Sequence, residues 1–158
     1  MLNGLSIRMG QDKDADVLAA FNVALARETE GKDLSLSVVR QGVQKLLENP
    51  QHGFYVVAET ADAVIGSAMI TFEWSDWRCG LFWWFQSVYV KRQFRRQGVF
   101  RKLFEFVKDR ASRQGIVCGL RVYVEQSNRA AQGVYAALGM ERTCYNRIYE
   151  QLLPGYRD

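Results

Sequence analysis

A short basic loop that leads into a glycine is the strongest chemical signal in this chain. The segment Arg95-Arg96-Gln97-Gly98-Val99-Phe100 follows an apolar run that ends at Val88-Tyr89-Val90. A helix that starts at such a glycine presents unpaired backbone N–H groups and the positive end of its dipole. Glycine lets a phosphate approach this backbone closely, and flanking arginines add charge-assisted hydrogen bonds. The segment therefore predicts a site for a diphosphate.

The charge around this loop also indicates an anionic partner. Residues 91–102 include six basic residues and no acidic one, in a chain of net charge +4. A nucleic-acid-binding module that uses 91–102 is an alternative interpretation, but a single glycine-started helix explains the run better, so we expect no nucleic acid partner. The pattern is neither GxGxxG nor GxxxxGK[ST], which argues against dinucleotide and P-loop sites.

The cysteines and the histidine offer little other chemistry. The chain has three widely spaced cysteines and one histidine, His52, which lies in a turn-like NPQHG segment. A disulfide framework and a zinc site are therefore not expected, and we expect no metal. A Cys–His nucleophilic pair or a serine hydrolase triad would both depend on this one histidine, which is better interpreted as a surface residue.

A second segment carries a family resemblance. Asn128 stands at the start of an expected helix, Tyr135 lies on the same helix, and Leu138-Gly139-Met140 follows. Together with the loop at Gly98, this segment resembles the two acetyl-CoA segments of the GNAT N-acetyltransferases. The family loop reads Arg/Gln-x-x-Gly-x-Gly/Ala, so Phe100 stands where the family has a small residue. Taken alone, Asn128 would be an N-cap and Tyr135 a core tyrosine.

The resemblance implies an acetyltransferase that uses acetyl-CoA as the acyl donor. A neutral amine would attack the thioester carbonyl directly and form a tetrahedral intermediate. A backbone N–H from Val88, Tyr89 or Val90 would polarise the carbonyl oxygen as charge develops on it. Tyr135 would protonate the departing thiolate, because a phenol of pKa about 10 can protonate a thiolate of similar basicity.

A general base and an acceptor site complete the expected machinery. Glu73 ends the strand before the central one and is the expected base, directly or through water, although a surface glutamate is an alternative. Acidic and aromatic residues stand where the family often shapes its acceptor pocket, which suits a cationic amine of a small molecule or a peptide. The expected substrate residues are Glu28, Glu30, Trp74 and Asp76. The tryptophans are alternatively core or dimer contacts, so a homodimer stays open.

The elements that must position these residues follow from the hydrophobic periodicity. Strands are expected at 5–9, 54–59, 64–72, 81–90, 116–124 and 145–151, and Gln86-Ser87 suggests a bulge in the nearly all-apolar central run. Helices are expected after Asp12 or Asp14, after Ser35 or Ser37, from Gly98, and after Ser127 or Asn128. The order is β α α β β β α β α β. The resemblance implies a mixed α/β fold, a GNAT-like central sheet of six to seven strands flanked by about four helices.

Length and composition suit one ordinary globular domain. The chain has 158 residues, 48% hydrophobic and 24% charged, with no repeat and no linker, so we expect a single acetyltransferase domain over 1–158. No apolar stretch is long enough to span a bilayer, and the N-terminus lacks the apolar core of a signal peptide, so a cytoplasmic protein without membrane contact is expected. A non-catalytic acyl-CoA sensor is the main alternative to an enzyme.

Overall fold

The computed structural model describes residues 4–144 of the chain. The chain divides into two compact units, Met1–Tyr123 and Val124–Asp158. The first unit holds the sheet and three helices, and the second holds α4 (Arg129–Ala137). The single domain expected from the sequence stays a prediction.

The first unit is built on one five-stranded sheet in the order β1-β2-β3-β4-β5. The first four strands pair antiparallel, and β4 pairs parallel with β5. The helix α3 (Val99–Ser112) makes the crossover that this parallel pair requires. The strands are β1 (Ser6–Met9), β2 (Gly53–Glu59), β3 (Val64–Ser75), β4 (Gly80–Val90) and β5 (Val117–Val122).

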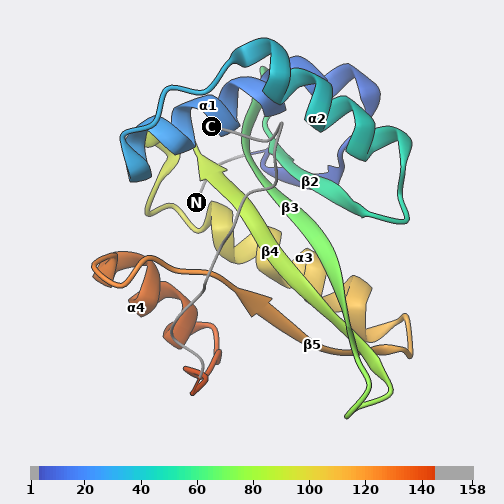
Figure 1. Ribbon diagram of the computed structural model, residues 1–158. Coiled ribbons are helices and arrows are strands. Elements are labelled where there is room, and N and C mark those ends of the chain that lie inside the picture. The colour runs from blue at the N-terminus through green and yellow to red at the C-terminus, as the bar shows by residue number, and fades with distance from the viewer. Residues whose placement is uncertain (1–3, 145–158) are drawn as a thin grey trace. The chain divides into compact units, whose positions relative to one another are not determined.

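Helices cover the sheet on both faces. The helices α1 (Ala15–Glu30) and α2 (Leu36–Glu48) lie together on one side, and α3 lies behind the strands in Figure 1. Alternation along the strands explains this layering, because successive side chains point to opposite faces. Tyr55 and Val57 join the cluster under α1 and α2, whereas Phe85 stacks on Phe104 of α3 at 5.5 Å between ring centroids.

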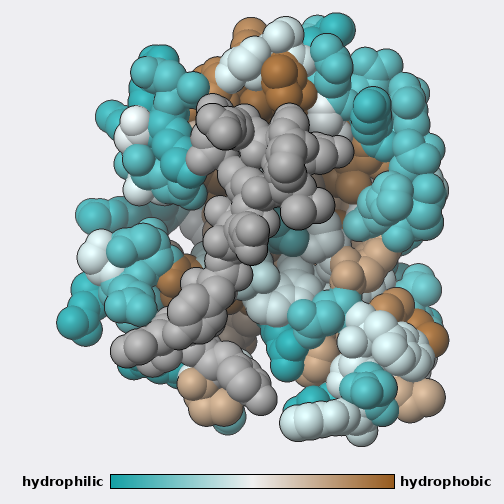
Figure 2. All heavy atoms as spheres, in the orientation of Figure 1, coloured by the Kyte–Doolittle hydropathy of each residue, from teal (hydrophilic) through white to brown (hydrophobic). Residues whose placement is uncertain are grey.

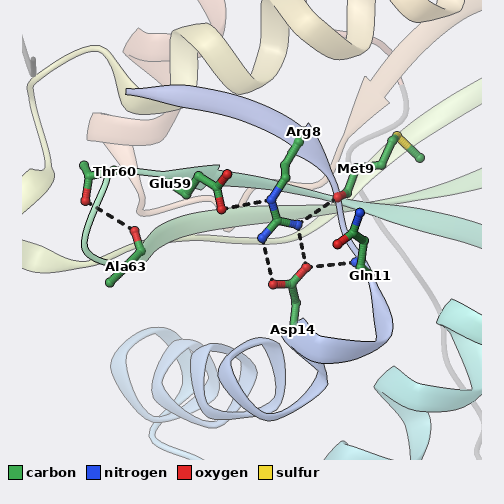
Figure 3. Close-up of polar contacts among 7 residues, drawn as sticks. All are labelled: Arg8, Met9, Gln11, Asp14, Glu59, Thr60 and Ala63. Atoms are coloured by element: carbon green, nitrogen blue, oxygen red, sulfur yellow. Dashed lines mark hydrogen bonds and ion pairs between the residues drawn. The ribbon is translucent and has the colours of Figure 1, made fainter. Parts of the chain in front are cut away.

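A partly buried ion pair holds the first strand to the first helix. The carboxylate of Asp14 accepts hydrogen bonds from both terminal nitrogens of Arg8, at 2.7 and 2.9 Å, and from the backbone N–H of Gln11 at 2.8 Å (Figure 3). Glu59 of β2 accepts from Nε of the same guanidinium at 2.9 Å. One arginine therefore links β1, β2 and the start of α1.

The order of elements agrees with the sequence prediction as far as residue 144. The structure has β1 α1 α2 β2 β3 β4 α3 β5 α4, with two 3-10 turns, Asp12–Asp14 and Arg92–Phe94. Five strands are fewer than the six to seven expected, and the strand predicted at 145–151 lies outside the described residues. Within residues 4–144, every helix is too short or too polar to serve as a membrane span.

Candidate functional site

The central strand β4 has a bulge near its end, as the sequence predicted. Ser67 pairs with Tyr89 and Met69 with Gln86, so β4 carries two residues where β3 carries one. Ser87, in the bulge, has φ +47°, a left-handed conformation that is uncommon for a residue other than glycine. The extra residue disrupts the ladder locally, and such bulges often lie next to ligand sites.

Beyond the bulge, β4 leaves its parallel neighbour. The pairing of β4 with β5 runs from Leu81/Val117 to Phe85/Val122. Among the residues that the structure describes, no strand pairs with 86–90 on this side of β4. The backbone around Val88 to Val90 therefore forms an open edge, where N–H groups can point at a ligand instead of at a strand.

The helix α3 begins with an uncapped, open N-terminus. Its N-cap is Gly98, with φ +80°, and no described side chain caps this end. A Cβ at Gly98 would meet no atom of the described residues within 4 Å, so the space beside this residue is open. Arg96 is also left-handed, with φ +63°. Consecutive N–H groups at such an end and the positive end of the helix dipole favour an anion.

The Phe100 ring lies against other aromatic rings near the start of α3. It lies 6.0 Å from the ring of Phe85 and 6.3 Å from that of Phe104, between centroids. The bulky residue thus packs between α3 and the sheet, in the same layer as Val99, which is 2% exposed. The half-buried Phe100 ring therefore contacts other aromatic rings of α3 and β4 at this departure from the family pattern.

The two arginines of the loop have different environments. Arg95 donates from Nε to the carbonyl of Val90 at 2.7 Å and from Nη2 to Glu28 at 2.8 Å. Arg96 is exposed and makes no ion pair within residues 4–144. Gln97 donates to the carbonyl of Gln93 at 2.8 Å and so closes the loop. Arg96 is therefore the cation of the loop that is available to a phosphate.

A pocket of about 450 Å³ lies on the other side of the bulge, between α1, α2 and the sheet. Ser87, Tyr55 and Met69 contribute from the strands, and Asn22 and Glu30 from α1. Leu25, Ala26, Thr29, Leu34, Val39, Gly42 and Val43 complete its wall. Its surface is mainly apolar with a few polar groups, and the pocket is open to solvent.

The floor of this pocket holds a polar pair that the sequence did not suggest. Asn22 donates from Nδ2 to the hydroxyl of Tyr55 at 3.1 Å. Tyr55 is 2% exposed, and burial raises the pKa of its phenol, against the smaller effect of the Asn22 hydrogen bond. The two residues are 33 positions apart, and each falls in an ordinary amphipathic or β-rich stretch, so no local signal marks them.

The comparisons with known proteins agree with this geometry. A model of the acetyltransferase (GNAT) family matches residues 20–140. The chain belongs to the GNAT acetyltransferase family. A possible acetyltransferase from Clostridium difficile 630 is 40% identical, with a TM-score of 0.86 over 94% of this chain and 98% of that one.

More distant GNAT structures share the fold alone. A predicted acetyltransferase from Clostridium acetobutylicum, solved with acetyl-CoA, is 16% identical, with a TM-score of 0.75 over 92% of this chain and 96% of that one. An aminoglycoside acetyltransferase from an uncultured soil metagenomic sample is 17% identical, with a TM-score of 0.76 over 95% and 98%. No match to the chain was found among curated proteins.

Glu28 does not line the pocket that Ser87 and Glu30 share, but it lines a second one of about 450 Å³ together with Arg92 and residues of α1. Its carboxylate accepts from Tyr89 Oη and Arg92 Nε, both at 3.3 Å, and from Arg95 Nη2. The hydrogen bond from Arg95 lowers the pKa of Glu28 most, with Arg92 adding to the effect and burial opposing it. The role of Glu28 at the substrate stays a prediction, and the structure places its carboxylate against the end of β4 and the loop before α3. Glu30, on the same helical turn, does line the pocket and pairs with Lys32 at 3.4 Å.

Glu73 is not brought to the bulge. It pairs with Phe82 in the ladder, six residues before Val88, which is about 20 Å along a strand. Its carboxylate instead binds Arg121 of β5, whose guanidinium lies 3.6 Å from the centroid of the Phe82 ring. The hairpin explains the difference, because the end of β3 adjoins the beginning of β4 and not its end.

Trp74 and Asp76 belong to the same distant hairpin end. Trp74 is 54% exposed and Trp77 85% exposed, so neither is a core residue. Asp76 is exposed in the turn. Figure 2 shows pale, teal and brown surface mixed at the lower right, where this end of the β3–β4 hairpin lies in Figure 1. The structure therefore does not place these two predicted substrate residues in the pocket.

The second unit carries the other two predicted residues. Asn128 caps α4, because its Oδ1 accepts from the N–H of Ala131 at 3.0 Å. Tyr135 lies on the same helix, and burial raises the pKa of its phenol. Gly139 follows the helix with φ +80°, as expected of a C-terminal glycine. Residues 4–144 contain no cluster of His, Cys, Asp and Glu that could hold a metal ion.

Proposed function

We propose that the chain is an N-acetyltransferase that moves the acetyl group of acetyl-CoA to an amine. One observation carries the proposal: the bulged, unpaired end of β4 leads directly into the open N-terminus of α3. The first feature suits an acyl carbonyl and the second a diphosphate. Acetyl-CoA contains both groups, linked by an extended arm.

The diphosphate would bind at the start of α3. The space beside Gly98 is open among the described residues, and Arg96 supplies a cation that no described acidic residue neutralises. The thioester would lie along β4, with its oxygen accepting a hydrogen bond from an N–H of residues 88–90. A backbone donor that is already in place stabilises developing negative charge without reorganising during the reaction.

The acceptor would enter through the pocket on the opposite side of the bulge. Ser87 belongs to both the bulge and the pocket wall, so an amine in the pocket faces the same stretch of β4 as the thioester. Glu30 is the acidic residue of the pocket and suits a cationic group, while the apolar wall suits a hydrocarbon body. We therefore favour a small amine, or the terminal residue of a peptide, with an apolar part.

In the reaction, the amine nitrogen forms a bond to the carbonyl carbon and the carbon–sulfur bond breaks. Tyr135 is proposed to protonate the departing thiolate, on the basis of its residue type, its raised pKa and its place in the second acetyl-CoA segment. The register argues against Glu73 as a direct base, so water in the pocket beside Glu30 is the proposed acceptor of the amine proton.

A single pair of measurements tests the proposal. We expect acetyl-CoA to raise the melting temperature of the protein, because a ligand that binds only the folded state stabilises it. A panel of amines should then include at least one that releases free thiol from acetyl-CoA. Stabilisation without release on any amine would instead support an acyl-CoA sensor. Salt-sensitive binding to DNA or RNA without stabilisation would support a nucleic-acid module.

A further inference from the structure

Glu28 connects the last turn of α1 to the loop between β4 and α3. Its carboxylate contacts Tyr89, Arg92 and Arg95, which are 61, 64 and 67 positions away in the chain. The Glu28 side chain is 21% exposed, and those of Arg95 and Arg92 are 40% and 74% exposed. We name these four residues the Glu28 clamp. It unites an element on one face of the sheet with the loop that leads to the candidate diphosphate site.

Within the clamp, Arg95 is held from three directions. Besides Glu28, it donates to the carbonyl of Val90 at 2.7 Å, and its guanidinium lies over the Tyr89 ring at 5.5 Å from the centroid. A planar guanidinium fixed by two hydrogen bonds and an aromatic face has little freedom left. The backbone at Arg95 is therefore tied both to the end of β4 and to α1.

The residues that follow Arg95 need such an anchor. Arg96 has φ +63°, a conformation that costs energy for a residue with a Cβ and persists only when its surroundings impose it. This turn directs the chain into Gly98 and sets the direction of the first N–H groups of α3. A loop released at Arg95 would reach this conformation in a smaller fraction of molecules, and its apparent affinity for an anion would fall by that fraction.

We infer that Glu28 is a positioning residue that holds the loop before α3 in the conformation that binds the diphosphate of the acyl donor, acting through Arg95. The inference rests on the proposed function, because it takes acetyl-CoA as the donor. In this proposal, the last turn of α1 contributes to both sites: Glu28 holds the loop before α3, and Glu30 lines the proposed acceptor pocket.

The first test is the substitution Glu28→Gln, which keeps the shape of the side chain and removes its charge. We expect the Kd for acetyl-CoA to rise roughly fivefold to tenfold, which is the effect of losing one charged hydrogen bond that is partly exposed. The value of kcat at saturation should stay within about twofold, because the reacting atoms are not touched. Calorimetry and steady-state kinetics give the two quantities, and a melting curve checks the fold.

Two thioester donors separate positioning from general damage. S-acetylpantetheine carries the same thioester but no diphosphate, so kcat/KM for it should be equal in Glu28→Gln and the unmodified protein. The value for acetyl-CoA should fall. An equal loss with both donors, or no loss with either, overturns the inference. Absence of acetyl-CoA binding in the unmodified protein would overturn the proposed function itself, which is a different outcome.

Two further variants complete the design. Asp33→Asn removes another carboxylate near the end of α1, one that pairs with Arg27 on the exposed surface, and should leave the Kd for acetyl-CoA unchanged. Arg95→Gln should weaken acetyl-CoA binding, and adding Glu28→Gln to it should cost little more, because both act through one contact. Fully additive losses in this cycle would show that Glu28 does not act through Arg95.

Discussion

Two neighbouring arginines in the loop before α3, Arg95 and Arg96, have different environments. Arg95 is engaged by Glu28, by the Val90 carbonyl and by the Tyr89 ring, so its guanidinium is part of the architecture. Arg96 points to solvent from a left-handed backbone and has no acidic partner within the described part of the chain. Residue type alone cannot separate these roles. The position of α1 does, because it brings a carboxylate to one arginine and leaves the other available.

At the same scale, Tyr135 can be tested as the proposed acid. Tyr135→Phe should lower kcat roughly 100-fold, the low end for removal of a general acid, and should leave the Kd for acetyl-CoA nearly unchanged. Burial raises the pKa of this phenol, so it stays protonated through neutral and moderately alkaline pH. The alkaline limb of the kcat profile that belongs to Tyr135 should therefore lie above about pH 10 and be absent in the variant.

The control for this change is Tyr123→Phe. Tyr123 is 53% exposed and stacks on Trp84 at 4.3 Å between centroids, so the loss of its hydroxyl should leave kcat unchanged. An undiminished kcat in Tyr135→Phe would remove this residue from the mechanism. The thiolate would then have to take its proton from water.

At the scale of elements, the start of α3 decides whether the donor can bind. Gly98→Ala places a methyl group on a residue with φ +80°, which costs about 1–2 kcal/mol of stability for a residue with a Cβ. The methyl group meets no atom of the described residues within 4 Å, so it would project into the space proposed for the diphosphate. We expect a lower melting temperature and a loss of acetyl-CoA affinity, measured by thermal unfolding and calorimetry.

Gly115 offers a matched control beyond the other end of the same helix. It has φ +66°, and a Cβ there also meets nothing within 4 Å. Gly115→Ala should therefore lose similar stability and keep its affinity for acetyl-CoA. Equal affinities in the two variants would mean that the diphosphate does not approach Gly98.

The elements themselves were predictable because their signals are local. Apolar alternation and helical periodicity gave the order of strands and helices, and Gln86-Ser87 marked the bulge that the register confirms. The distance of Glu73 from the bulge could not be predicted from local signals, because it follows from topology: in a hairpin, the last residues of β3 face the first residues of β4. The Glu28 clamp and the Asn22–Tyr55 pair were missed because they join residues 33 or more positions apart. Such contacts depend on how the helices pack on the sheet.

At the scale of the first unit, we expect the hydrogen bonds between Arg8, Asp14 and Glu59 to contribute to the free energy of unfolding. Asp14 is 3% exposed, and its pKa reflects opposing effects: burial raises it, but the hydrogen bonds from Arg8 and from the N–H of Gln11 outweigh burial and lower it. Asp14→Asn would leave the charge of Arg8 only partly compensated by Glu59. Removing one partner of this partly buried pair should cost about 1–3 kcal/mol, or roughly 2–12 °C in melting temperature for a chain of this size.

The stability lost in Asp14→Asn should become smaller as the pH falls. The pKa of Asp14 is lower in the folded chain than in the unfolded chain, where an aspartate has a pKa of about 3.9. Its charge therefore stabilises the fold fully above that unfolded pKa. The stabilisation is lost as the pH falls through the folded pKa. Thermal unfolding from pH 7 to pH 2 should therefore show the gap between the unmodified protein and Asp14→Asn narrowing below about pH 4. Asp16→Asn, which removes an exposed partner of Arg40, should change the melting temperature little at any pH. A gap of constant size down to pH 2 would mean that the charge of Asp14 does not contribute, and that β1 is held to α1 by shape alone.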